Sequence, residues 1–185
     1  SHLAEPMYIS YWSALNYYGL TEQVPLTVFI ATTKRLPDKD IHNVKYRFVT
    51  LTDEKFFGFE PVSVGSQQVN IATVEKAIVD CADHPEYCGG IRELAKALSR
   101  TENLDADRLT EYLLQQGNGA AIKRIVYLTD ILDIDIARRN ELENAFTTGY
   151  SKLDPTKSDS GKHDSEYRLR LNVDRSVLAS AGGRQ

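Results

Sequence analysis

The sequence contains no long apolar run, and no segment approaches the roughly 20 apolar residues that a membrane-spanning helix needs. Residues 1–6 read SHLAEP, which has neither the basic start nor the apolar middle of a secretory leader. Only two cysteines are present, Cys81 and Cys88, which excludes a disulfide scaffold. The net charge is −4, so the overall basic charge of many nucleic-acid binders is missing. These absences predict a cytoplasmic protein with no membrane partner, in which any contact with nucleic acid comes from a local patch.

Sequence motifs for nucleotide binding and serine hydrolysis are missing too. There is no G-x-x-x-x-G-K-[ST], no G-x-G-x-x-G after a predicted strand and no G-x-S-x-G. The four histidines fall in the N-terminal tail, in turns and in a polar loop, where surface or capping roles are expected: His2, His42, His84 and His163. No cofactor is expected.

Residues 69–98 form the unit against which the other segments are expected to pack. Residues 69–72 alternate between apolar and other side chains, as in a strand, and the spacing of apolar residues then becomes helical from Thr73 onward. Thr73 is expected to cap this helix, and the residue before Pro85 to end it. Gly89 and Gly90 then lead into a second helix over 91–98.

The order of the remaining elements predicts an α+β fold, an irregular α/β arrangement in which a mixed β-sheet is packed with several helices. Helices are expected over 8–19, 107–116, 120–134 and 136–146, strands over 27–33, 44–51 and 167–173, and a turn with a short strand over 56–64. Residues 34–40 are expected to be a charged turn, 158–165 a polar loop and 175–185 a flexible tail. Since a lone strand is not stable, 167–173 must return to the sheet formed earlier.

Asp38, Asp53 and Lys55 form the sharpest catalytic pattern. Pro37-Asp38 followed by Asp53-Glu54-Lys55 resembles the signature of PD-(D/E)xK nucleases. In that interpretation two carboxylates on neighbouring strands hold Mg²⁺, which activates water for phosphodiester cleavage, and the lysine offsets the developing charge. The alternative is that both segments are solvated turns, since residues 37–40 read as a plain turn.

Two further groups of polar residues are expected to be structural. Cys81, His84 and Cys88 offer soft metal ligands within eight residues, but a structural zinc site normally has four ligands. Cys81 lies on the apolar stripe of its helix, so buried thiols and no metal are expected. Asp130, Asp133 and Asp135 form an acidic cluster near a helix end, which is expected to be a solvated face.

Basic residues are concentrated on the early strands and on the last one. If the last strand pairs near residues 44–51, their faces merge into a patch able to contact phosphate or an acidic partner. The alternative is an ordinary charged face of a one-sided sheet. The patch residues are Lys34, Arg35, Lys45, Arg47, Arg168 and Arg170.

Aromatic residues are frequent in the predicted helix over 8–19. Their large area suits a packing face. A separate hypothesis is self-association through a dimerisation surface that exposes Tyr11, Tyr17 and Tyr18.

Several blocks of the sequence, in this order, resemble the C-terminal domain of AbiEi-type antitoxins. They read YISYWSAL at 8–15, GLTEQ at 19–23, TVFIATT at 27–33, VNIATVEKAIVD at 69–80 and CADHPEYCGGIRELAKAL at 81–98. With the late strand over 167–173, the resemblance covers residues 4–174. The domain is therefore expected over 8–174, between a leader (1–7) in which Ser1-His2 is typical of a cloning remnant and the tail (175–185).

The resemblance implies a non-enzymatic domain of a transcriptional regulator from a type IV toxin–antitoxin, or phage abortive-infection, system. In that family a winged helix before this domain binds operator DNA, and this domain supports antitoxicity and cooperative repression. The paired toxin is nucleotidyltransferase-like and is neutralised without a stable complex. No winged-helix segment is found before Tyr8, so operator binding is expected of a longer protein.

Overall fold

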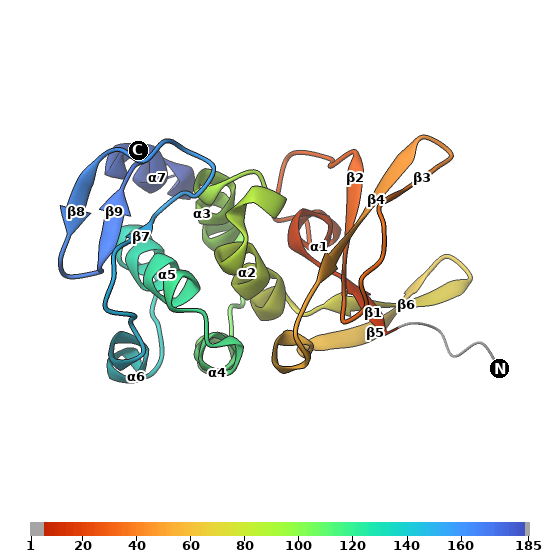
Figure 1. The fold of residues 1–185 in the computed structure, drawn as a ribbon, viewed down its shortest axis with the longest axis horizontal. Coiled ribbons are helices and arrows are strands. Elements are labelled where there is room, and N and C mark those ends of the chain that lie inside the picture. Colours follow the sequence, from red (N-terminus) through yellow and green to blue (C-terminus); the bar gives the residue numbers. More distant parts are fainter. Residues whose placement is uncertain (1–5, 184–185) are drawn as a thin grey trace.

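The computed structural model describes residues 6–183. A six-stranded mixed sheet occupies one end of the molecule, and helices with a second, three-stranded sheet occupy the other (Figure 1). The predicted α+β class is confirmed. Residues 1–5 of the expected leader, together with 184 and 185 of the expected tail, lie outside the described residues.

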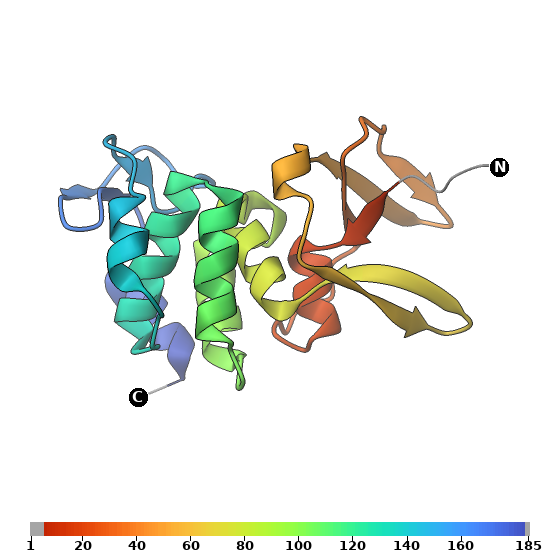
Figure 2. The same ribbon diagram turned by 90° about the horizontal axis from the view of Figure 1, so that it is seen from below.

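The larger sheet has the strand order β3-β4-β2-β1-β6-β5. Its strands are β1 (Met7–Ile9), β2 (Thr27–Thr32), β3 (Lys39–Ile41), β4 (Val44–Thr50), β5 (Phe59–Val64) and β6 (Gln67–Ala72). The first strand of the chain thus lies near the middle of the sheet, antiparallel to β2 and parallel to β6. Figure 2 shows the β2–β4 pair and the β5–β6 hairpin diverging from β1 as two arms.

The predicted helix over 8–19 is wrong in its first turn. Residues Met7–Ile9 form β1, and the helix α1 spans only Tyr11–Tyr17. Ser10 lies at the N-cap position, but its hydroxyl donates to Asp80 at 2.6 Å and caps no helix amide. The contact with a residue 70 positions away therefore overrides the local capping preference. The strand β3 (Lys39–Ile41) also begins within residues 34–40, the segment predicted to be a turn.

The helix α2 (Val74–Asp83) lies between the larger sheet and the other helices (Figure 1), and all of its residues except Val74 are buried. Its predicted start is confirmed, because the Thr73 hydroxyl accepts a hydrogen bond from the Lys76 amide at 3.3 Å. A 3-10 turn, η2 (Pro85–Tyr87), follows, and then α3 (Ile91–Arg100). The strand-to-helix unit predicted at 69–98 is therefore the centre of the fold.

The helices α4 (Ala106–Gln116), α5 (Gly119–Leu132) and α6 (Arg139–Asn144) pack beyond α2. Asn118 caps α5 by accepting from the Ala121 amide at 3.0 Å. α6 is shorter than the predicted helix over 136–146. The buried apolar side chains of α2 to α5 form one core with those of the sheet and α1, among them Leu15, Phe29, Ile71, Ile78, Leu94, Leu113 and Ile125.

The expectation that the last strand returns to the early sheet is wrong. β9 (Leu169–Leu171) pairs with β7 (Ser151–Lys152) and β8 (Lys162–Asp164) in a separate sheet, and β8 lies within the predicted polar loop. The C-terminal segment thus supplies its own strand partners and buries Leu169 against the helices. This sheet lies at the far end of the molecule from β4 (Figure 1).

The segment predicted to be a flexible tail contains a helix, α7 (Arg175–Ala179), followed by the 3-10 turn η3 (Ser180–Gly182). Leu178 of α7 is fully buried, which explains why the segment packs. Within residues 6–183, no helix is both long and apolar enough to cross a bilayer.

Candidate functional site

Four of the six predicted patch residues lie on one arm of the larger sheet. Lys45 and Arg47 are two residues apart on β4, so their side chains point to the same face. Lys34 and Arg35 follow the end of β2, which runs parallel to β4. All four side chains are exposed. Lys45 and Arg47 lie opposite Thr27 and Phe29 of β2, whereas Lys34 and Arg35 lie beyond Thr32, which pairs with Thr50. These four exposed basic residues are called here the β4 face.

An aromatic cluster lies beneath the β4 face. The guanidinium carbon of Arg47 is 4.8 Å from the ring centroid of Tyr87 in η2, a cation–π distance. Tyr87 in turn packs edge-on against Tyr11, at 5.3 Å between centroids, and lies 5.7 Å from Phe29. His84 completes the cluster, 5.2 Å from Tyr87. Arg47 is thus positioned by a ring from another element while it remains exposed.

Tyr11 is fully buried, so the predicted exposure of this residue on a dimerisation surface is wrong. Its backbone has a φ of 54°, a strained value for a residue with a side chain. Within residues 6–183, its hydroxyl is the one buried side-chain oxygen or nitrogen without a hydrogen-bond partner. Burial, and then the charge of Asp80, raise the pKa of this phenol well above its ordinary value.

The other two tyrosines of α1 differ in exposure. Tyr17 is 50% exposed. Tyr18 is half-buried, and its hydroxyl donates to the carbonyl of Ala72 at 2.7 Å. Burial raises the pKa of Tyr18 to about 12. Of the three tyrosines predicted for an interface, Tyr17 alone is largely exposed.

The buried carboxylate of Asp80 on α2 joins both parts of the molecule. One of its oxygens accepts hydrogen bonds from Tyr8 at 2.9 Å and from Ser10 at 2.6 Å, both from the sheet side. The other accepts from Lys76 at 2.9 Å and from Gln116 of α4 at 3.1 Å. Four donors therefore compensate a charge that would otherwise be costly to bury.

Lys76 is the cation of this network, and its side chain is completely buried. Besides Asp80, its ammonium donates to the carbonyl of Lys55 at 2.8 Å and to the side chain of Gln116. It also lies 4.1 Å from the ring centroid of Phe57. Burial lowers the pKa of Lys76, and the charge of Asp80 opposes that effect.

Asp83, one turn further along α2, forms the second half of the network. Its carboxylate accepts from Lys55 of η1 (Asp53–Lys55) at 2.7 Å and from Gln116 at 3.1 Å. Lys55 was predicted to serve a nuclease site with Asp38 and Asp53. In the structure it pairs with Asp83, and Asp38 accepts a hydrogen bond from the Phe48 amide at 3.2 Å.

Arg168 and Arg170 do not join the β4 face, which corrects the prediction of one merged patch. They belong to the C-terminal sheet, at the opposite end of the molecule (Figure 1). Arg168 precedes β9 with a φ of 50°, and its guanidinium donates to the carbonyl of Thr147. Arg170 forms an ion pair with Asp159 at 2.5 Å. The prediction failed because β9 pairs locally.

The two cysteines are free and fully buried, as the sequence predicted. Burial, and then a contact with Cys88, raise the pKa of the Cys81 thiol well above its ordinary value. Protonated, buried thiols are poor nucleophiles and poor metal ligands. In the part of the chain that the structure describes, no group of three or more histidine, cysteine or acidic side chains is placed to hold a metal ion.

Lys123 and Arg124 are adjacent buried cations on α5. Lys123 donates to the Gly149 carbonyl and to the Ser151 hydroxyl, and both of these acceptors are uncharged. Arg124 donates to the carbonyl of Ala82 at 2.8 Å and to that of Lys152 at 2.9 and 3.1 Å. Burial, followed by the charges of Arg168 and Arg124, lowers the pKa of Lys123.

The lowered pKa of Lys123 predicts a pH-dependent effect of the Lys123→Met substitution. Between the folded-state pKa and the ordinary value of 10.5, the unfolded chain binds more protons at this site, so its contribution to the free energy of unfolding rises with pH. The native protein should therefore gain stability relative to Lys123→Met as pH rises toward 10.5. Urea unfolding of both proteins at several pH values above about 7 measures this difference. A difference independent of pH would contradict the prediction.

The buried network was not predicted as such from the sequence. The sequence does contain a signal for it, because Lys76 and Asp80 have opposite charges and are four residues apart on the predicted helix, a spacing at which side chains meet. Gln116 carries no such signal, since a polar residue before a glycine is typical of any helix end. Its role depends on how α4 packs against α2.

No family model and no curated protein matches the sequence. The chain is similar in structure to the RV2827C protein from Mycobacterium tuberculosis, with a TM-score of 0.66 and 18% sequence identity. The similarity covers 99% of this chain and 68% of the mycobacterial one. At this level of identity the likeness concerns the fold alone.

Proposed function

We propose that this chain is a non-enzymatic regulatory domain of an AbiEi-type antitoxin, acting in the cytoplasm and supporting antitoxicity and cooperative repression. The sequence resemblance over residues 4–174 suggests the class, and one structural observation carries the proposal. Asp80 and Asp83 are buried carboxylates of α2 that are bound by donors from several elements. Groups bound in this way stabilise an arrangement of elements.

The proposal is tested by toxicity rescue. The native gene for the full regulator and its neighbouring gene, which we expect to encode a nucleotidyltransferase-like toxin, are expressed together and separately. The full regulator should restore growth, and rescue by the present chain alone would locate antitoxicity in this domain. Failure of the full regulator to restore growth would contradict the assignment.

We further propose that the β4 face contacts DNA phosphates beside the operator site of a winged helix. Its four basic side chains are exposed: Lys45 and Arg47 project from β4, and Lys34 and Arg35 follow the end of the neighbouring strand β2. Arg170, by contrast, forms an ion pair with Asp159 in the other sheet. A protein that neutralises phosphates releases counterions, so its affinity for DNA falls as salt concentration rises.

Replacing Lys34 and Lys45 by glutamine should weaken the salt dependence of DNA binding. The slope of log K against log salt should become less steep by about 0.9 for each phosphate that the variant no longer neutralises. Fluorescence anisotropy with a duplex containing the operator region measures this slope for the full regulator. Arg92→Gln with Lys157→Gln, also exposed, is the matched control and should leave the slope unchanged. Equal slopes for both double variants would contradict the contact surface.

A further inference from the structure

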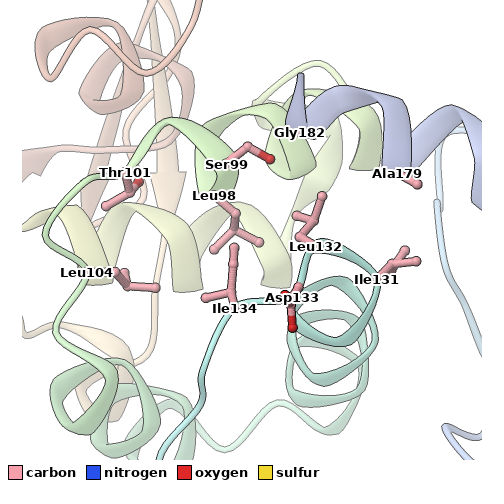
Figure 3. Close-up of a pocket in the computed structure, with 10 residues that line it drawn as sticks. All are labelled: Leu98, Ser99, Thr101, Leu104, Ile131, Leu132, Asp133, Ile134, Ala179 and Gly182. Atoms are coloured by element: carbon pink, nitrogen blue, oxygen red, sulfur yellow. The ribbon is translucent and has the colours of Figure 1, made fainter. Parts of the chain in front are cut away.

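A cavity of about 350 Å³ lies where the ends of α3 and α5 meet the C-terminal turn η3 (Figure 3). Its volume falls within the range of small-molecule sites, roughly 300–1,000 Å³. Its wall is polar and apolar in about equal parts, and the residues without a polar side chain are Leu98, Leu104, Ile131, Leu132, Ile134, Ala179 and Gly182. Ser99, Thr101 and Asp133 supply the polar atoms.

The electrostatics of this cavity favour a cation. Thr101 is the C-cap of α3 and Asp133 the C-cap of α5, and both residues line the wall. Each helix C-terminus carries roughly half a negative charge, and the carboxylate of Asp133 adds to it. Among the described residues that line the cavity there is no lysine, arginine or histidine. Two helix C-termini and Asp133 thus line one cavity, and none of the described residues in its wall is basic.

An adjoining hollow of about 270 Å³ extends the same field. It shares Asp133 and Ile134 with the cavity and is also lined by Asp130 and Asp135. Arg139 also lines this hollow, where it pairs with Asp130. Beside that ion pair, the hollow has two further acids, Asp133 and Asp135.

We propose that the cavity binds a small organic cation, a primary ammonium group on a short apolar chain. The apolar chain lies among Leu98, Leu132 and Ile134, and the ammonium faces Asp133 and the two helix ends. A carboxylate accepts several hydrogen bonds, so Asp133 can bind the ammonium in addition to its other interactions. This binding is separate from the proposed regulatory function, which involves the other end of the molecule.

Three probes with one apolar chain and different head groups test the proposal: n-hexylamine, n-hexanol and n-hexanoate. Amide chemical shifts are followed by NMR in titrations of the full chain at neutral pH. Hexylamine should bind at least tenfold more tightly than hexanol, and hexanoate should show no saturable binding. The amide shifts that hexylamine causes should cluster at residues of the cavity wall. Equal affinities for the amine and the alcohol, or shifts elsewhere, would overturn the proposal.

Two variants test separately the space in the cavity and the charge of its wall. A Cβ atom at Gly182 would lie 3.6 Å from Leu132 and Ser99, an ordinary contact, so Gly182→Leu should fill the cavity and abolish binding of both hexylamine and hexanol. Gly149→Leu, at an exposed glycine with open space around it, is the control and should bind normally. Asp133→Asn should weaken the binding of hexylamine at least fivefold and leave the binding of hexanol unchanged. If Gly182→Leu does not fold, Asp133→Asn tests the proposal by itself. Undiminished amine binding by Asp133→Asn would contradict the proposal.

Discussion

Asp80→Asn should destabilise the protein by about 3–5 kcal/mol, because it leaves the fully buried ammonium of Lys76 without its carboxylate. Asparagine has nearly the same shape as aspartate, so little of the loss comes from packing. The amide keeps one acceptor oxygen for Tyr8 and Ser10. Its NH2 group then faces Lys76 and Gln116, which both donate to the other carboxylate oxygen, so lost hydrogen bonds add to the lost charge. Urea unfolding followed by circular dichroism measures the effect.

A second substitution distinguishes charge from geometry at this site. In the double variant Asp80→Asn with Lys76→Met, no unpaired charge remains, so part of the lost stability should return, with a coupling energy of about 1–3 kcal/mol. Asp40→Asn, on the exposed edge strand β3, is the control and should change stability by no more than about 0.5 kcal/mol. A cost below about 1 kcal/mol for Asp80→Asn would show that the network contributes little to stability.

Arg124→Met should cost about 2–4 kcal/mol, since hydrogen bonds to a charged group are the stronger ones and their buried acceptors would stay unpaired. The guanidinium donates to the carbonyl of Ala82 in the last turn of α2, where a cation also favours the negative helix end. It donates as well to Lys152 of β7, so it ties the second sheet to the central helix. Thermal and urea unfolding measure the loss.

Arg92→Met on the exposed side of α3 provides the matched control for Arg124→Met. It removes the same atoms from a solvated position and should change stability by no more than about 0.5 kcal/mol. If the two arginine variants lose equal stability, the buried hydrogen bonds of Arg124 do not explain its effect.

Elements with a strong periodic pattern could be predicted from the sequence. The α2 helix, its Thr73 cap, the strands near 27–33 and 44–51 and the two helices after residue 106 occur where apolar spacing indicates them. The failures concern non-local contacts. Tyr8 and Ser10 fit a helix by local pattern, but their hydroxyl groups bind Asp80, which holds residues 7–9 in an extended strand.

The candidate site could be predicted only in part. Strand alternation predicts that Lys45 and Arg47 share one face, and the structure places both residues on β4. The merger with Arg168 and Arg170 depended on which strand β9 would pair with, and a single sequence does not determine that pairing. Lys55 could likewise be assigned to a turn. Its ion pair with Asp83 could not be predicted, because it depends on how η1 and α2 contact each other in the fold.

The central position of β1 has a mechanical consequence. The chain enters the larger sheet at its middle strand, whose Tyr8 and the adjacent Ser10 hold the carboxylate at the core of α2. A force applied to the chain before Pro6 would therefore act on both diverging arms and on α2 at the same time. A domain attached there would be mechanically coupled to all three.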